Sequence, residues 1–264
     1  MRPFVSSEVP HVNIAIFTAT RWEFQAVVEA FTVERTTTMA GVRCAIGRRG
    51  KAHVSVWQSG IGLQKAAHVS LAALGHASWD LVVSSGFAGA LVPCAVGTLV
   101  VGDEVQLGEA SEISKSREYY PILCDDIFRS RAFQVSRSID QGSQCGHIVS
   151  LSRIIGTSTE KKIVADHTHA VALDMESASL GSVARSHHIP FIVVRTISDL
   201  WDEDLPIDFN LFLHPRDWVK GVGAILRNPA SLFHIVQFQR QVAVASRRLT
   251  MFFKIFFDEM EHAS

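Results

Sequence analysis

Short apolar runs alternate with segments of helical spacing along most of this chain, and this alternation constrains its fold more than any other feature. The runs at 12–19, 79–86 and 189–199 are mostly apolar, which is typical of strands buried on both faces. The segments with helical spacing lie at 21–31, 62–74 and 157–167. The pattern predicts a single α/β domain with a central mixed β-sheet flanked by helices.

The remaining segments refine this prediction. Residues 42–60 alternate in polarity and turn near Gly50, so they predict a hairpin, and 96–108 predicts a further strand. The run 79–86 is expected to end in a glycine turn. The polar stretch 109–145 predicts no regular structure.

Length and composition limit the class of protein. A chain of 264 residues with 47% hydrophobic and 19% charged residues can form one large core and is not disordered. A net charge of −1 argues against a general nucleic-acid binder. No apolar run is long enough to span a bilayer and no signal-peptide pattern is present, so a cytoplasmic protein is expected. The spacing of cysteines and histidines predicts neither a metal site nor a cofactor.

The chain divides into a leader at 1–11, the α/β domain at 12–214 and a C-terminal arm at 215–264. Pro229 is expected to start a long amphipathic helix in the arm. Apolar residues recur along it at steps of three and four, at Ile235, Phe238, Val242, Ala245, Leu249, Phe252 and Phe256.

The arm allows two interpretations. Its apolar seam can pack on this domain or on a second subunit, as such seams usually do. Alternatively, the helix makes a peripheral contact with an anionic membrane through its basic face, which carries Arg240, Arg247 and Lys254. In that case Phe233, Phe253 and Phe257 would widen the apolar side.

Two acidic residues stand where chemistry is expected. Asp199 ends the run 189–199, and ligands of open α/β sheets bind at the carboxyl ends of strands. Glu176 follows a short strand into a helix whose dipole favours an ionised carboxylate, and Asp174 is the expected cap of that helix. Arg195 is a charge inside an apolar run, so a salt bridge to one site carboxylate is expected. From the residues alone, a loop cap at Asp199 and a surface carboxylate at Glu176 remain open alternatives.

Four short pieces of sequence occur in a fixed order. They are the junction that carries Glu23, the Gly-x-Ala-Gly sequence of Gly86, Ala88 and Gly89, the pair Met175-Glu176, and the run Arg-Thr-Ile-Ser-Asp from Arg195 to Asp199. Together they resemble the nucleoside phosphorylase/nucleosidase superfamily over roughly residues 12–212. The resemblance is strongest to the branch that hydrolyses 5′-methylthioadenosine and S-adenosylhomocysteine.

The resemblance implies roles for these residues. It makes Asp199 the general acid that protonates the imidazole nitrogen of a purine, with Ser198 orienting it, and makes Glu23 the general base for water. It makes Glu176 the acceptor of hydrogen bonds from two ribose hydroxyls, with Met175 packed against the sugar.

The resemblance also implies further substrate contacts. Ala88 and Gly89 line the site, and Arg195 supports a site carboxylate. Ile154 contacts the purine through its backbone, and Phe209 lies against the 5′ substituent. Phe87 replaces the small residue usual in the glycine turn and is expected to reshape the pocket.

The choice between water and phosphate as acceptor depends on one strand position. In the phosphorylase branch an arginine precedes the glycine turn, and this chain has Ser84 on that strand. The predicted function is therefore hydrolysis of an adenine nucleoside with an apolar 5′ substituent by a homodimer, without metal or cofactor.

Three alternatives to this function remain. The arm looks similar to that of hopanoid-associated members, which remove adenine from a lipid-linked nucleoside. The chain could instead be a phosphorylase of purine nucleosides. It could also be a non-catalytic nucleoside-binding module, because fold does not fix function.

Overall fold

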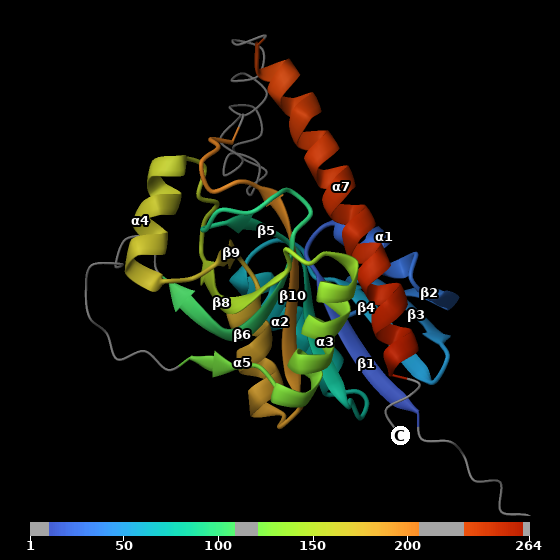
Figure 1. The fold of residues 1–264 in the computed structure, drawn as a ribbon. Coiled ribbons are helices and arrows are strands. Elements are labelled where there is room, and N and C mark those ends of the chain that lie inside the picture. The colour runs from blue at the N-terminus through green and yellow to red at the C-terminus, as the bar shows by residue number, and fades with distance from the viewer. Residues whose placement is uncertain (1–10, 109–120, 206–229, 261–264) are drawn as a thin grey trace, which may run out of the picture.

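The computed structural model of this protein describes residues 11–108, 121–205 and 230–260 (Figure 1). The strands are β1 (Val12–Thr18), β2 (Thr32–Met39), β3 (Val42–Arg49), β4 (Ala52–Gln58), β5 (Leu81–Ala90), β6 (Leu99–Gly108), β7 (Ile122–Leu123), β8 (Gln144–Leu151), β9 (Ala172–Asp174) and β10 (Phe191–Asp199). The helices are α1 (Arg21–Val28), α2 (Leu63–Leu74), α3 (Asp126–Ile139), α4 (Ser158–Thr168), α5 (Ser177–Ser186) and α7 (Ala230–Glu259).

The described strands form one mixed sheet, in agreement with the predicted fold class. Its order is β10-β6-β8-β9-β5-β1-β4-β3-β2, with β7 added to β6. β10 pairs with β5 as well as with β6, so β5, β9, β8, β6 and β10 form a closed ring of pairings. β1 and β4 extend the sheet in parallel from β5, and β3 and β2 continue it antiparallel.

Helices cover both faces of the sheet. Alternate residues of β1 point into two separate cores, Ile16 into the first and Phe17 into the second. Helices α1, α3 and α7 contribute to the first core, whereas α2 and α5 contribute to the second. Helix α4 packs on β8 and β9 through a third, smaller cluster that includes Val164.

Most of the predicted elements are present. The hairpin within 42–60 is β3–β4, and the strand within 96–108 is β6. The prediction of no regular structure at 109–145 is wrong for its second half, which contains α3. That helix is mostly polar and buries only a narrow strip, but Asp125 caps it by accepting hydrogen bonds from the N–H groups of Ile127 and Phe128.

Helix α7 belongs partly to the domain core. Along its second half one apolar seam is fully buried: Ala245, Leu249, Phe252, Phe253, Phe256 and Phe257. This half packs on α1, α3 and β10, so its seam is covered by this domain, and Phe253 and Phe257 do not widen an exposed apolar face. Figure 1 shows the first half extending beyond the sheet, where the side chain of Val236 is 47% exposed and that of Val244 is 42% exposed.

Pro229 and the start of the arm lie outside the described residues. In the part of the chain that the structure describes, no helix combines the length and the apolar character needed to cross a membrane.

Candidate active site

Two neighbouring parallel strands end at the candidate site. β10 lies beside β5, with Arg195 opposite Gly86 and Asp199 opposite Gly89. β1 lies on the other side of β5 and leads into α1, whose first turn carries Glu23. Because these parallel strands end at the same edge of the sheet, segments far apart in the sequence meet there.

The glycines of β5 make space for the charged side chains. A Cβ atom on Gly86 would overlap the Glu23 carboxyl group and lie 2.7 Å from Nη1 of Arg195. A Cβ atom on Gly89 would lie 2.9 Å from Oδ2 of Asp199. The prediction of a glycine turn is therefore wrong: the segment continues β5 through Ala90, and its glycines allow charged side chains close to the strand.

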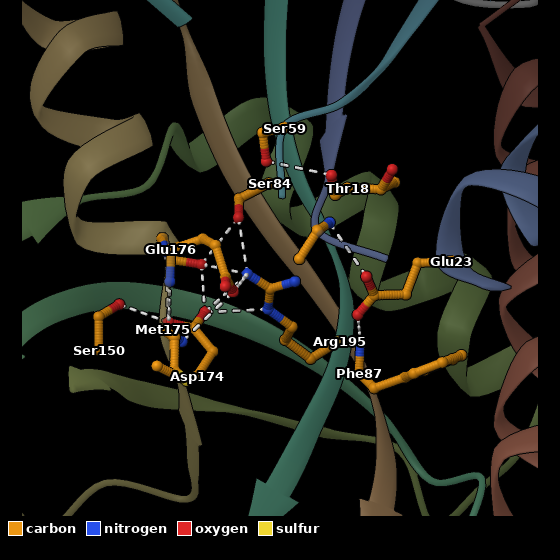
Figure 2. A network of polar contacts seen from close by, with 12 residues as sticks. Thr18, Glu23, Ser59, Ser84, Phe87, Ser150, Asp174, Met175, Glu176 and Arg195 are labelled. Atoms are coloured by element: carbon orange, nitrogen blue, oxygen red, sulfur yellow. Dashed lines mark hydrogen bonds and ion pairs between the residues drawn. The ribbon is translucent and has the colours of Figure 1, made fainter. Parts of the chain in front are cut away.

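Glu23 is 4% exposed, and backbone amides hold both of its oxygens. Oε2 accepts hydrogen bonds from the N–H groups of Ala19 at 3.0 Å and Thr20 at 2.6 Å, which completes a capping box at the start of α1. Oε1 accepts from the N–H group of Phe87 at 2.7 Å, which fixes the carboxyl group against β5. The Phe87 ring packs on the core beneath α1 and α7, and Figure 2 shows it directed away from Glu176.

Arg195 forms the centre of a buried polar network (Figure 2). Its Nε and Nη2 atoms lie 2.9 Å and 2.8 Å from Oδ2 of Asp174, and each side chain is 1% exposed. Nη2 also donates to the hydroxyls of Ser84 at 2.8 Å and Ser177 at 2.9 Å. The expected salt bridge is present, and its main partner is Asp174, since Glu176 lies 4.0 Å from Nη2.

Asp174 also supports the start of the following helix, although the N-cap residue of that helix is Glu176 and not Asp174, which was the predicted cap. Its Oδ1 atom accepts hydrogen bonds from the N–H groups of Glu176 at 3.2 Å and Ser177 at 3.3 Å, and from the hydroxyl of Ser150 at 2.5 Å. The residue therefore serves two purposes, because it starts α5 and neutralises the buried charge of Arg195. The sequence indicated the first purpose and not the second.

Glu176 is the N-cap residue of α5, one position before the expected first turn, and is 7% exposed. Its Oε1 atom accepts from the N–H group of Gly62 at 2.9 Å and Oε2 from that of Met175 at 3.3 Å. Burial raises the pKa of Glu176 to about 8, against the lowering effect of Arg195. Burial therefore acts against the ionised carboxylate that the helix dipole favours.

Asp199 differs from the other site acids because it remains partly open. Its side chain is 13% exposed and borders a cavity of about 220 Å³ that α7 also lines, through Gln237, Phe238 and Gln241. The hydroxyl of Ser198 donates to Oδ1 at 2.9 Å, which is the orienting contact expected for that residue.

Lys161 is a site residue that the sequence did not reveal. It lies on α4, is fully buried, and places Nζ 2.7 Å from Oδ2 of Asp199. Its spacing offered a weak signal, because Lys161 shares the buried side of α4 with Val164 and Thr168. A lysine at such a position needs a buried partner.

Of the remaining residues predicted to contact substrate, two are buried at the site, one lies in a loop and one lies outside the described residues. Met175 is 8% exposed next to Glu176, and Ala88 is buried on β5, where its carbonyl accepts a hydrogen bond from Ser198 at 3.4 Å. Ile154 is half-buried in the loop between β8 and α4. Phe209 lies outside the described residues.

Together these residues bring four carboxyl groups and two cations to one edge of the sheet. Acidic groups in two environments, one sealed and one open to a cavity, are suited to acid–base chemistry on a small ligand. Among the residues that the structure describes, no group of histidine, cysteine, aspartate and glutamate side chains could hold a metal ion.

Comparison with known proteins agrees with the family that the sequence resembles. Residues 13–214 match the family model of the phosphorylase superfamily. A putative methylthioadenosine nucleosidase from Weissella paramesenteroides superimposes with a TM-score of 0.72 at 21% identity, covering 96% of this chain and 98% of that one.

Two Helicobacter pylori proteins are similar in structure. A mutant of its MTAN, solved with 5′-methylthioadenosine in the active site, gives a TM-score of 0.73 at 19% identity, with 94% of this chain and 99% of that one covered. Its futalosine hydrolase gives 0.70 at 20% identity, with 94% and 98% covered. At these identities the superpositions show a shared fold. The match of the family model over most of the domain shows that this chain is an enzyme of the phosphorylase superfamily, as the four sequence pieces predicted.

Proposed function

We propose that this protein hydrolyses the N-glycosidic bond of an adenine nucleoside that carries an apolar 5′ substituent. The observation that carries the proposal is that both buried cations of the site are already held by acidic side chains. Arg195 contacts Asp174, and Lys161 contacts Asp199. A phosphorylase needs cationic groups to hold phosphate, and using either of these would take a buried cation away from its partner at high cost.

The residue that precedes the glycines of β5 also favours water over phosphate as the acceptor. Ser84 is fully buried there and accepts a hydrogen bond from Arg195, so this part of the strand is occupied by an internal network. Water as the acceptor needs no additional cation. The site contacts described above therefore favour hydrolysis over phosphorolysis.

The catalytic roles are those that the family resemblance implies, and the positions of the carboxyl groups support them. As the C–N bond breaks, its electron pair moves to the purine, and Asp199, which borders the cavity, donates a proton to the base. Water adds to the anomeric carbon and gives its proton to Glu23. Although Glu23 accepts three backbone hydrogen bonds, a carboxylate has about four acceptor positions, which leaves one for the water. Glu176 binds the ribose hydroxyls, with Met175 against the sugar.

Adenine release in phosphate-free buffer tests this proposal. 5′-Methylthioadenosine is the first substrate to try, and the expected products are adenine and the free 5-methylthioribose. A strict requirement for phosphate, with a ribose 1-phosphate as product, would assign phosphorolysis instead. Binding of the nucleoside by calorimetry without any turnover would assign a non-catalytic binding module.

A lipid-linked adenine nucleoside, such as an adenosyl hopanoid, is the second candidate substrate. It is favoured by the exposed first half of α7, where Val236 and Val244 lie one helical turn to either side of the exposed basic residue Arg240. This surface also suits a second copy of the chain in a homodimer.

Co-sedimentation with vesicles and measurement of the molecular mass decide between these uses of α7. Membrane contact requires binding to anionic vesicles that salt weakens. If the protein ignores the vesicles and is a dimer in solution, the exposed half of α7 is better explained as subunit interface.

A further inference from the structure

Lys161 uses its whole hydrogen-bonding capacity at the end of β10. Its Nζ atom lies 2.7 Å from Oδ2 of Asp199, 2.5 Å from the carbonyl of Leu200 and 3.2 Å from the carbonyl of Glu203. An ammonium group has three N–H donors, so these three acceptors account for all of them. Lys161 therefore has no donor left for a substrate and acts on any ligand through Asp199.

The position of Lys161 also distinguishes the two oxygens of Asp199. Oδ2 faces the buried ammonium, whereas Oδ1 accepts a hydrogen bond from the hydroxyl of Ser198. The side chain of Lys161 has no exposed surface, and a buried ammonium is costly unless a negative partner is fixed next to it. This arrangement leaves Oδ1 as the oxygen available to a leaving group.

We propose that Lys161 is a positioning residue that makes Asp199 an effective proton donor to the departing base; the proposal rests on the hydrolase function above. When the C–N bond breaks, the proton on Oδ1 moves to the purine and Asp199 becomes a carboxylate. The ammonium of Lys161 attracts that carboxylate more strongly than it attracts the neutral acid. It therefore stabilises the transition state, in which the charge develops, more than the bound substrate.

Three variants on α4 test this role. Lys161→Met keeps the length of the apolar stem and removes the charge, and Lys161→Arg restores a charge. Lys162→Met is the matched control, because Lys162 is the next residue on the same helix and is exposed. For each variant, kcat and KM for 5′-methylthioadenosine are measured together with the melting temperature.

Lys161→Met is expected to lower kcat roughly ten- to a hundredfold, which is less than the loss of the acid itself, about 10²- to 10⁴-fold. KM is expected to change less than threefold, because Lys161 does not contact substrate. Lys161→Arg should recover part of kcat, and Lys162→Met should behave as the unchanged protein. A fall in kcat/KM caused only by a higher KM would overturn the proposal.

Two further measurements separate this role from a structural one. 5′-Methylthiotubercidin has carbon in place of the N7 atom that is protonated, so its affinity should be the same in Lys161→Met and in the unchanged protein. In an Asp199→Asn background, Lys161→Met should cause little additional loss of rate, because its effect passes through Asp199. Weaker binding of the analogue, or full additivity of the two changes, would show that Lys161 only holds the loop after β10.

Failure of this proposal and failure of the hydrolase function give different results. If Asp199→Asn abolishes turnover while Lys161→Met leaves kcat unchanged, the function stands and the role of Lys161 is wrong. If Asp199→Asn retains normal turnover, the assignment of the general acid is itself wrong.

Discussion

The two buried ion pairs of the site are alike in composition and different in surroundings. In the sealed pair, Arg195–Asp174, both side chains are 1% exposed, and Ser84 and Ser177 take up further hydrogen bonds of the arginine. In the open pair, Lys161–Asp199, the lysine is fully buried while the carboxylate is 13% exposed beside a cavity. Asp174 is enclosed and paired with a buried arginine, so it supports the structure, whereas Asp199 faces a cavity and can exchange a proton with a ligand. For these two pairs, the difference in enclosure separates support from chemistry.

The largest expected effect is on turnover, from Asp199→Asn in the open pair. The amide keeps the shape of the side chain and cannot act as an acid, so the rate of adenine release should fall about 10²- to 10⁴-fold. The side chain is only partly buried, so stability should change much less than activity. Initial rates and melting temperatures of the same preparation check both parts. Near-normal turnover, or loss of the folded state, would remove the distinction between the two pairs.

The second largest expected effect is a loss of stability, caused by Arg195→Met in the sealed pair. Removing the arginine leaves Asp174 buried without its cation, and breaking such a pair typically costs about 3–5 kcal/mol in the free energy of unfolding. Urea denaturation measures the change, with Arg185→Met as the control because Arg185 is an exposed arginine on α5. A loss of activity with unchanged stability would mean that Arg195 acts on the substrate rather than on the fold.

The part of the site around Asp199 could largely be predicted, because the residues that indicate it are adjacent in the sequence. The apolar run of β10 and the acid at its tip are adjacent in sequence, and Ser198 contacts the residue that follows it. The glycines of β5 were recognised as a pattern, but their function of making space for Glu23 and Asp199 depends on strands that come together only in the fold.

Features that depend on long-range contacts could not be predicted. Lys161 is an ordinary helix lysine in sequence, and it becomes a site residue because α4 packs against the end of β10. The closed ring of strands depends on β10 pairing along both of its edges, which hydrophobic patterns do not encode. Glu176 was predicted to be ionised from the local helix dipole, whereas burial by distant segments raises its pKa.

The smallest expected effect concerns Glu176, which lies next to the sealed pair. Its pKa is raised from 4.5 to about 8 in the folded protein, mainly by burial. The folded state therefore holds the proton more tightly than the unfolded chain, so this contribution to stability is complete below about pH 4.5 and is lost as pH rises toward 8. Glutamine cannot ionise, so Glu176→Gln should gain stability relative to the unchanged protein as pH increases.

Urea denaturation of both proteins at pH 5 and pH 9 measures this difference in the free energy of unfolding. Other titrating groups are common to both proteins and cancel in the comparison, provided that they do not interact with Glu176. The substitution should also weaken ribose binding, because an amide accepts fewer hydrogen bonds than a carboxylate. If the two proteins differ in free energy of unfolding by the same amount at both pH values, Glu176 is ionised in the folded protein. That is the state which the helix dipole alone predicts. In that case burial by distant segments would not set the protonation of Glu176.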